Sequence, residues 1–84
     1  MRTIWKYIID DITKVQVWQL SENTQFLTLQ LQNGVPTAWF LVDPTKLQSR
    51  VFAIIGTGHE VPNNSQYLAT WQDSPFVWHL FELF

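Results

Sequence analysis

The chain contains no cysteine, few charged residues and no long apolar run. Without cysteine, neither a disulfide framework nor a thiolate zinc site can hold the fold together, and the absence fits a reducing cytosol. No apolar segment approaches the roughly 18 residues that span a bilayer, and the first residues lack the apolar region and cleavage site of a secretory signal. We therefore expect a cytoplasmic protein with no membrane partner.

Charge is sparse, since the 84 residues include five Lys or Arg and seven Asp or Glu. Phosphate backbones are bound chiefly through clustered cations, so we expect no nucleic-acid partner. A surface with so little charge is unusual for a soluble monomer. The composition therefore predicts a homo-oligomer, a dimer or larger.

Apolar residues make up 46% of the chain and include five Trp, six Phe and two Tyr. A domain of this size buries only about 60% of the surface of its unfolded chain, and each aromatic ring removes roughly 150–250 Å² from water. Residues 1–84 are thus expected to fold as one domain with an aromatic core. No linker, low-complexity tract or internal repeat is evident.

The strongest local signal is Asn33-Gly34, because both residues tolerate the positive φ angles of a type I′ turn. It predicts a hairpin in which residues 25–32 pair with residues 35–42 and Leu27 lies opposite Phe40. In this register the alternating leucines of the first strand share a face with the apolar residues of the second.

The other face of this hairpin is apolar at its far end, where Phe26, Trp39 and Leu41 are expected to lie. A second layer or a partner must cover that end. These three residues are therefore candidate interface residues.

Further strands are predicted, from β-branched and aromatic content, at residues 3–9, 13–20, 50–55, 66–71 and 76–84. A helix over residues 11–20 is the rival interpretation, with Asp11 as its cap, but Val15, Val17 and Trp18 lower helix propensity. Asp43-Pro44 predicts a short helical turn through Gln48.

The last segment, from Phe76, is apolar on both faces, so it is expected to be central in a sheet or buried against another subunit. Six to seven short strands separated by turns indicate a mainly β fold, a small antiparallel β-barrel or β-sandwich with at most one short helical turn.

Four segments occur together in this order: Ile4-Trp5-Lys6-Tyr7, then Leu29 to Pro36 continuing through Trp39 to Val42-Asp43-Pro44, then Gly56-Thr57-Gly58-His59, and last Val77 to Glu82. As a set they resemble a family of small phage and prophage proteins that is classified only as a domain of unknown function. The resemblance spans nearly the whole chain. It implies an accessory protein made inside an infected or lysogenic bacterium, and it carries over no catalytic residue.

Gly56-Thr57-Gly58-His59 is the best candidate ligand-binding element. Two glycines allow backbone amides to converge on an anion, and Thr57 and His59 can add side-chain donors. Arg50 and Lys46 are the nearest cations in the sequence. The alternative is a plain turn after a strand, because the longer glycine pattern of a phosphate loop is missing.

No pattern of residues indicates a metal site, a cofactor or an enzyme. The spacing of His59, His79 and the acidic residues demands no metal, and the serines lie in turns without the sharp strand-to-helix turn that exposes a nucleophile. The tryptophans have a second interpretation besides core, because Trp dominates protein interfaces and stacks on nucleobases. Trp39 and Trp78 are the first candidates for such a surface, together with Phe81 in the last strand.

The sequence therefore predicts a small phage-type accessory protein that acts by binding. The favoured function is inhibition of bacterial anti-phage immunity, either by trapping a nucleotide-derived signal near Gly56 to His59 or by occluding a host defence protein. A minor virion or assembly protein is the alternative, and a small uncharacterised enzyme is the second alternative.

Overall fold

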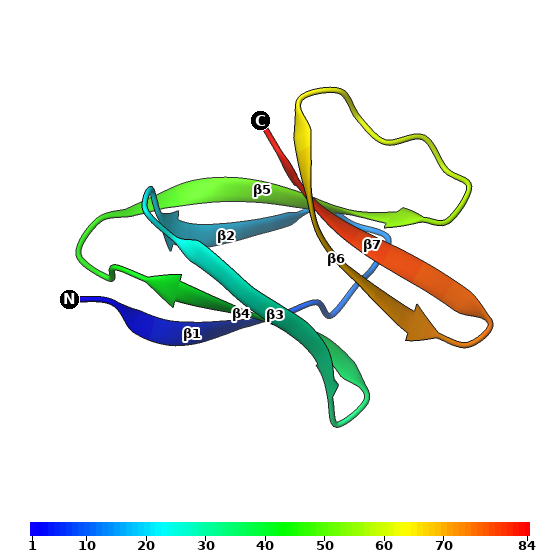
Figure 1. Cartoon of the computed structure of the whole chain (residues 1–84), viewed down its shortest axis with the longest axis horizontal. Coiled ribbons are helices and arrows are strands. Elements are labelled where there is room, and N and C mark those ends of the chain that lie inside the picture. The colour runs from blue at the N-terminus through cyan, green and yellow to red at the C-terminus, as the bar shows by residue number, and fades with distance from the viewer.

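The computed structural model describes all residues 1–84 and is an antiparallel β-sandwich of seven strands (Figure 1). The strands are β1 (Thr3–Ile8), β2 (Gln16–Ser21), β3 (Gln25–Gln32), β4 (Val35–Val42), β5 (Leu47–Gly56), β6 (Ser65–Asp73) and β7 (Phe76–Leu83). One sheet has the order β1-β4-β3 and the other the order β2-β5-β7-β6. The molecule is only 17 Å thick, as expected for two stacked sheets. It contains no helix that is long and apolar enough to cross a membrane.

The predicted β3–β4 hairpin is confirmed at its turn, where Asn33 and Gly34 have φ angles of 52° and 79°. The register is also as predicted from Gln32 to Thr28, which lies opposite Trp39. Beyond this point the prediction is wrong, because the register shifts between Phe26 and Thr28 and Phe26, not Leu27, lies opposite Phe40.

This β-bulge reverses the faces of two neighbouring residues. The ring of Phe26 turns inward and meets Phe40 edge to face, with 5.3 Å between ring centroids. Leu27 turns outward and is 40% exposed. Phe26 is therefore a residue of the core and does not lie on the outer face of the three-stranded sheet.

The last strand is central in its sheet, as its two apolar faces indicated, since β7 lies between β5 and β6. A second bulge lies between Tyr67 and Ala69 of β6. Leu68, the extra residue at this bulge, packs against the core. Successive residues of β7 alternate between the core, which receives Leu80, and the outer face, which receives Phe81.

Aromatic rings from both sheets meet in the core. Trp18 lies 4.7 Å from Phe52 and 5.9 Å from Phe40, measured between ring centroids, and Tyr7 of β1 contacts both Trp18 and Phe40. Each such pair stabilises a core by about 0.5–1.5 kcal/mol in addition to the contribution of its buried apolar area. All five tryptophans are buried or half-buried, so a single copy of the chain shields its indoles better than the composition suggested.

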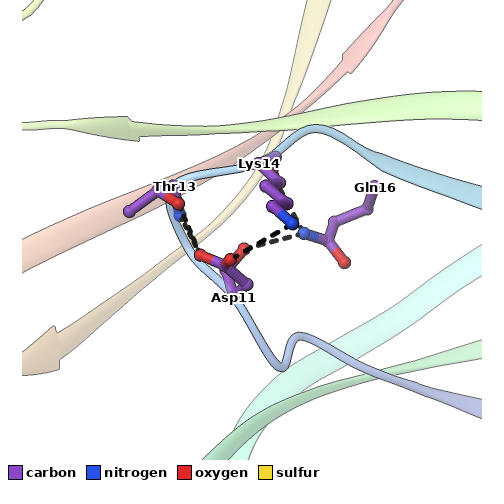
Figure 2. Close-up of polar contacts among 4 residues, drawn as sticks. All are labelled: Asp11, Thr13, Lys14 and Gln16. Carbon is purple, nitrogen blue, oxygen red and sulfur yellow. Dashed lines mark hydrogen bonds and ion pairs between the residues drawn. The ribbon is translucent and has the colours of Figure 1, made fainter.

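The β1–β2 and β4–β5 connections are turns, so the predicted helical turn through Gln48 is wrong and the rival helix over residues 11–20 does not form. In the first connection Oδ1 of Asp11 accepts hydrogen bonds from the backbone N–H and the hydroxyl of Thr13 (Figure 2). Asp43 makes the same two contacts with Thr45 in the second. These hydrogen bonds lower the pKa of both carboxyl groups.

The two turns share a short sequence motif, so the prediction of no internal repeat is wrong. Asp11-Ile12-Thr13-Lys14-Val15-Gln16 and Asp43-Pro44-Thr45-Lys46-Leu47-Gln48 have the form Asp-x-Thr-Lys-(Val/Leu)-Gln. Each carries the chain from one sheet to the other, and the strands that flank the first turn pair with those that flank the second, β1 with β4 and β2 with β5. The segment β1–turn–β2 and the segment β4–turn–β5 thus form one approximately symmetric unit.

Candidate functional site

The predicted Gly56–His59 element is a turn at the end of β5. The N–H of His59 donates to the carbonyl of Gly56 at 3.1 Å, and Gly58 has a φ of 91°. A Cβ added to Gly56 would lie 3.2–3.3 Å from the rings of His59 and Trp78, so glycine is what lets both rings close over this position. The glycines are therefore explained by the turn and by close packing.

Two shallow hollows, of about 380 and 250 Å³, lie beside this turn. None of the residues that line them is a lysine or an arginine. Arg50 is six positions from Gly56 along an extended strand, a distance of roughly 20 Å. The structure therefore does not bring Arg50 to the turn.

Arg50 is instead held by the carboxylate of Glu82. Its Nε and Nη2 donate to the two carboxylate oxygens at 2.6 Å, and its Nη1 donates to the carbonyl of Ser21 at 2.8 Å. The side chain of Glu82 is only 5% exposed and that of Arg50 is 19% exposed. Arg50 thus links β2, β5 and β7, and three of its five N–H donors serve this structural role.

His79 lies on the outer face of the four-stranded sheet in a chain of hydrogen bonds. Its Nε2 is 2.9 Å from Oγ1 of Thr57 and its Nδ1 is 2.8 Å from Oγ1 of Thr70, which in turn is 2.8 Å from the hydroxyl of Tyr67. The Thr57 hydroxyl also lies 3.3 Å from the carbonyl of Val77 and can donate to it. No acidic residue takes part in this chain.

The two predicted aromatic sites of β7 lie on opposite faces of the sheet. Trp78 points inward and packs against the core, and its buried Nε1 has no hydrogen-bond partner. One edge of its ring reaches the surface hollow beside Phe76, which stacks on it at 5.5 Å. Phe81 points outward, where its ring contacts Tyr67 at 5.6 Å.

The predicted interface residues Trp39 and Leu41 lie together on the outer face of the three-stranded sheet. The half-buried ring of Trp39 forms the floor of a hollow of about 300 Å³. Lys6 and Thr28 are its cross-strand neighbours, and Ile4 lies opposite Leu41. We call this region the Trp39 surface; its members are Ile4, Lys6, Leu27, Thr28, Gln30, Trp39 and Leu41.

Two exposed apolar members of the Trp39 surface, Ile4 and Leu27, were not among the predicted interface residues. Ile4 is 59% exposed because β1 is an edge strand and the core already receives its neighbour Trp5. Leu27 reaches the surface only through the bulge. Alternation along β1 would have identified Ile4 from the sequence, whereas nothing in the sequence marks the bulge.

The most spacious hollow, of about 640 Å³, is polar and lies at the opposite end of β5 from Gly56. Glu22 and Asp43 line it together with Lys46, so its charge does not favour a phosphate group. No group of three or more His, Cys, Asp or Glu side chains is placed to hold a metal ion.

Comparison with known families assigns the chain. Residues 1–84 match the family model described as "Domain of unknown function (DUF7352)", and the chain therefore belongs to this family. No curated protein and no solved structure matches it.

Proposed function

We propose that this chain is a small phage-type accessory protein that inhibits bacterial anti-phage immunity by binding and occluding a host defence protein through its Trp39 surface. The observation that carries the proposal is the hollow over Trp39, which the indole ring lines together with two apolar residues, Ile4 and Leu27, and two polar ones, Thr28 and Gln30. The motif resemblance to small phage and prophage proteins supports the setting.

The composition of the Trp39 surface suits a protein partner. Its centre combines one tryptophan with Ile4 and Leu27, and buried Trp at the centre of a patch is the commonest source of binding energy between proteins. Lys6 is the one charged residue of this surface, and the Lys6 Nζ donates a hydrogen bond to Oε1 of Gln32 at 2.9 Å. A complementary partner would insert an apolar side chain beside Trp39 and offer acceptors to Lys6 and Gln30.

The other predicted mode, capture of a nucleotide-derived signal at the Gly56–His59 turn, has less support. A nucleotide carries at least one phosphate, and the hollows beside the turn are lined without a cation. Stacking of a base on Phe76 or Trp78 is the one feature that favours it.

The experiment is a defence-protection assay. Bacteria that carry individual anti-phage systems are infected with and without expression of the chain, and we expect one system to lose its protection. Ile4→Lys places a charge on the Trp39 surface at an exposed position and should restore protection. Asn63→Lys, which adds the same charge to the exposed β5–β6 loop, is the matched control and should inhibit like the wild type.

Three results would contradict the proposal. Equal inhibition by both variants would exclude the Trp39 surface. Loss of inhibition only in His59→Ala, together with heat of binding from cyclic nucleotides, would support the signal sponge. Failure to affect any system, with the chain present in purified particles, would support the virion alternative.

A further inference from the structure

The outer face of the four-stranded sheet carries no charged residue. Alternation along the four strands places on it an apolar stripe, Val17, Val51, Ala53, Ile55, Phe81 and Leu83. The remaining outward residues are Ser, Thr, Gln, Leu47, Tyr67, Val77 and His79. Antiparallel sheets that face water on one side normally present polar and charged residues there.

The apolar stripe is continuous across the sheet. The register places Val17 of β2 beside Val51 of β5, and Val51 beside Leu83 of β7. Ala53 is beside Phe81, which contacts Tyr67 of β6. Ala53 is only 8% exposed although it does not belong to the core cluster, because its outward neighbours already crowd around it.

We propose that this face binds the same face of a second copy of the chain, giving a two-fold symmetric dimer of sandwiches. A two-fold axis brings a patch against itself, so any charge near its centre meets an equal charge on the partner. The sparse charges of this chain lie elsewhere, and the absence of charge on a whole sheet face is what self-contact requires. A charged partner would find no complementary group here.

The size of the face sets the strength of the dimer. Four strands spaced about 4.8 Å apart and about eight residues long give a footprint of roughly 500 Å² for each copy. Specific interfaces bury about 800 Å² for each partner, so this one lies at the weak end. We therefore expect a monomer–dimer equilibrium with a dissociation constant in the micromolar range.

In this dimer the two Trp39 surfaces would face away from each other, because each lies on the opposite sheet of its own sandwich. The inference does not depend on the proposed function, since the dimer forms without a host partner. If both hold, one dimer presents two equivalent binding surfaces and gains avidity toward an oligomeric target.

The test is sedimentation equilibrium of the full chain, for the wild type and two variants. Concentrations from about 1 to 500 µM cover roughly the range that a micromolar equilibrium requires. Val17→Lys changes a side chain that is 57% exposed on an edge strand, so the fold should tolerate it. It should weaken the dimer by about tenfold or more, since two like charges are brought together. Ile4→Lys, on the other sheet, should leave the dimer unchanged.

Isotope-filtered NMR on a mixture of labelled and unlabelled chains locates the contact. Intermolecular signals should connect the Ala53 methyl to the apolar stripe of the partner. A monomer at every concentration would overturn the proposal, as would a dimer that dissociates on Ile4→Lys but not on Val17→Lys, or intermolecular signals confined to the Trp39 surface.

Discussion

The ion pair between Arg50 and Glu82 offers the sharpest test of how this sandwich is held together. Glu82→Gln removes the negative charge but keeps the shape, so Arg50 loses its counter-ion at a site where it is only 19% exposed. Breaking a buried pair by removing one partner destabilises a protein by about 3–5 kcal/mol. A domain of this length has a total stability of roughly 4–13 kcal/mol. The single substitution therefore removes a large part of the stability.

The double variant Arg50→Met with Glu82→Leu separates the cost of an unpaired charge from the value of the pair. Replacing a whole buried pair by apolar residues is often neutral, so the double variant should be more stable than Glu82→Gln by about 2 kcal/mol or more. The Ser21 carbonyl would lose its partner, which limits the recovery by about 1 kcal/mol.

Urea unfolding followed by tryptophan fluorescence measures all these free energies, because Trp18 packs near this end of the core. With an unfolding entropy of about 2.1 cal/mol/K per residue, a loss of 3 kcal/mol also lowers Tm by roughly 15 °C. The reasoning is refuted if Glu82→Gln costs less than about 1 kcal/mol, or if the costs of Arg50→Met and Glu82→Leu, each measured alone, simply add in the double variant.

Three further predictions concern the turns, the cross-sheet tyrosine and the bulge. The carboxyl pKa values of Asp11 and Asp43 are lowered in the folded state. Their contribution to stability is therefore complete above about pH 5 and is lost as pH falls through the ordinary pKa near 3.9 to the lower folded values. The double variant Asp11→Asn with Asp43→Asn should show a smaller fall of Tm in acid, and an unchanged dependence of Tm on pH would contradict this. The Tyr7 hydroxyl donates to the carbonyl of Gln19 at 2.8 Å, and burial raises its pKa, so its contribution is present below about pH 10 and is lost as pH rises through the higher folded value. Tyr7→Phe should cost about 1 kcal/mol at neutral pH in urea unfolding, and no loss would show that the hydrogen bond is unimportant. Phe26→Ala should destabilise by about 3 kcal/mol and Leu27→Ala by less than about 1 kcal/mol, and the reverse order would mean that the bulge is misplaced.

Local chemistry predicted the parts of the fold that depend on neighbouring residues. Asn33-Gly34 fixed the hairpin because few other dipeptides adopt two successive positive φ angles. The two apolar faces of β7 predicted a strand that is central in a sheet or buried against another subunit, and the structure shows the first. The bulge at Leu27 could not be predicted, since Phe26 and Leu27 are both apolar and either one could face the core.

The candidate site was predicted less well because it depends on distances in space. Arg50 is near Gly56 in sequence, but an extended strand separates them and Glu82, from the far end of the chain, holds the guanidinium. Trp39 and Leu41 were identified by alternation. Alternation along β1 also marks Ile4 as outward, but its place beside Leu41 depends on pairing between residues more than thirty positions apart. The repeated Asp-x-Thr-Lys turns are only six residues long, which is too short to stand out as an internal repeat in the sequence alone.

The central position of β7 also determines when the protein can fold. The hairpins β3–β4 and β6–β7 form from neighbouring segments, and β2 pairs with β5 directly, but this pair joins β6 only after β7 has been inserted beside β5. A ribosome-bound chain that ends before residue 76 therefore exposes β5 as an unpaired edge and cannot close its hydrophobic core. Folding must follow synthesis of this strand, so the nascent chain needs protection from aggregation until then.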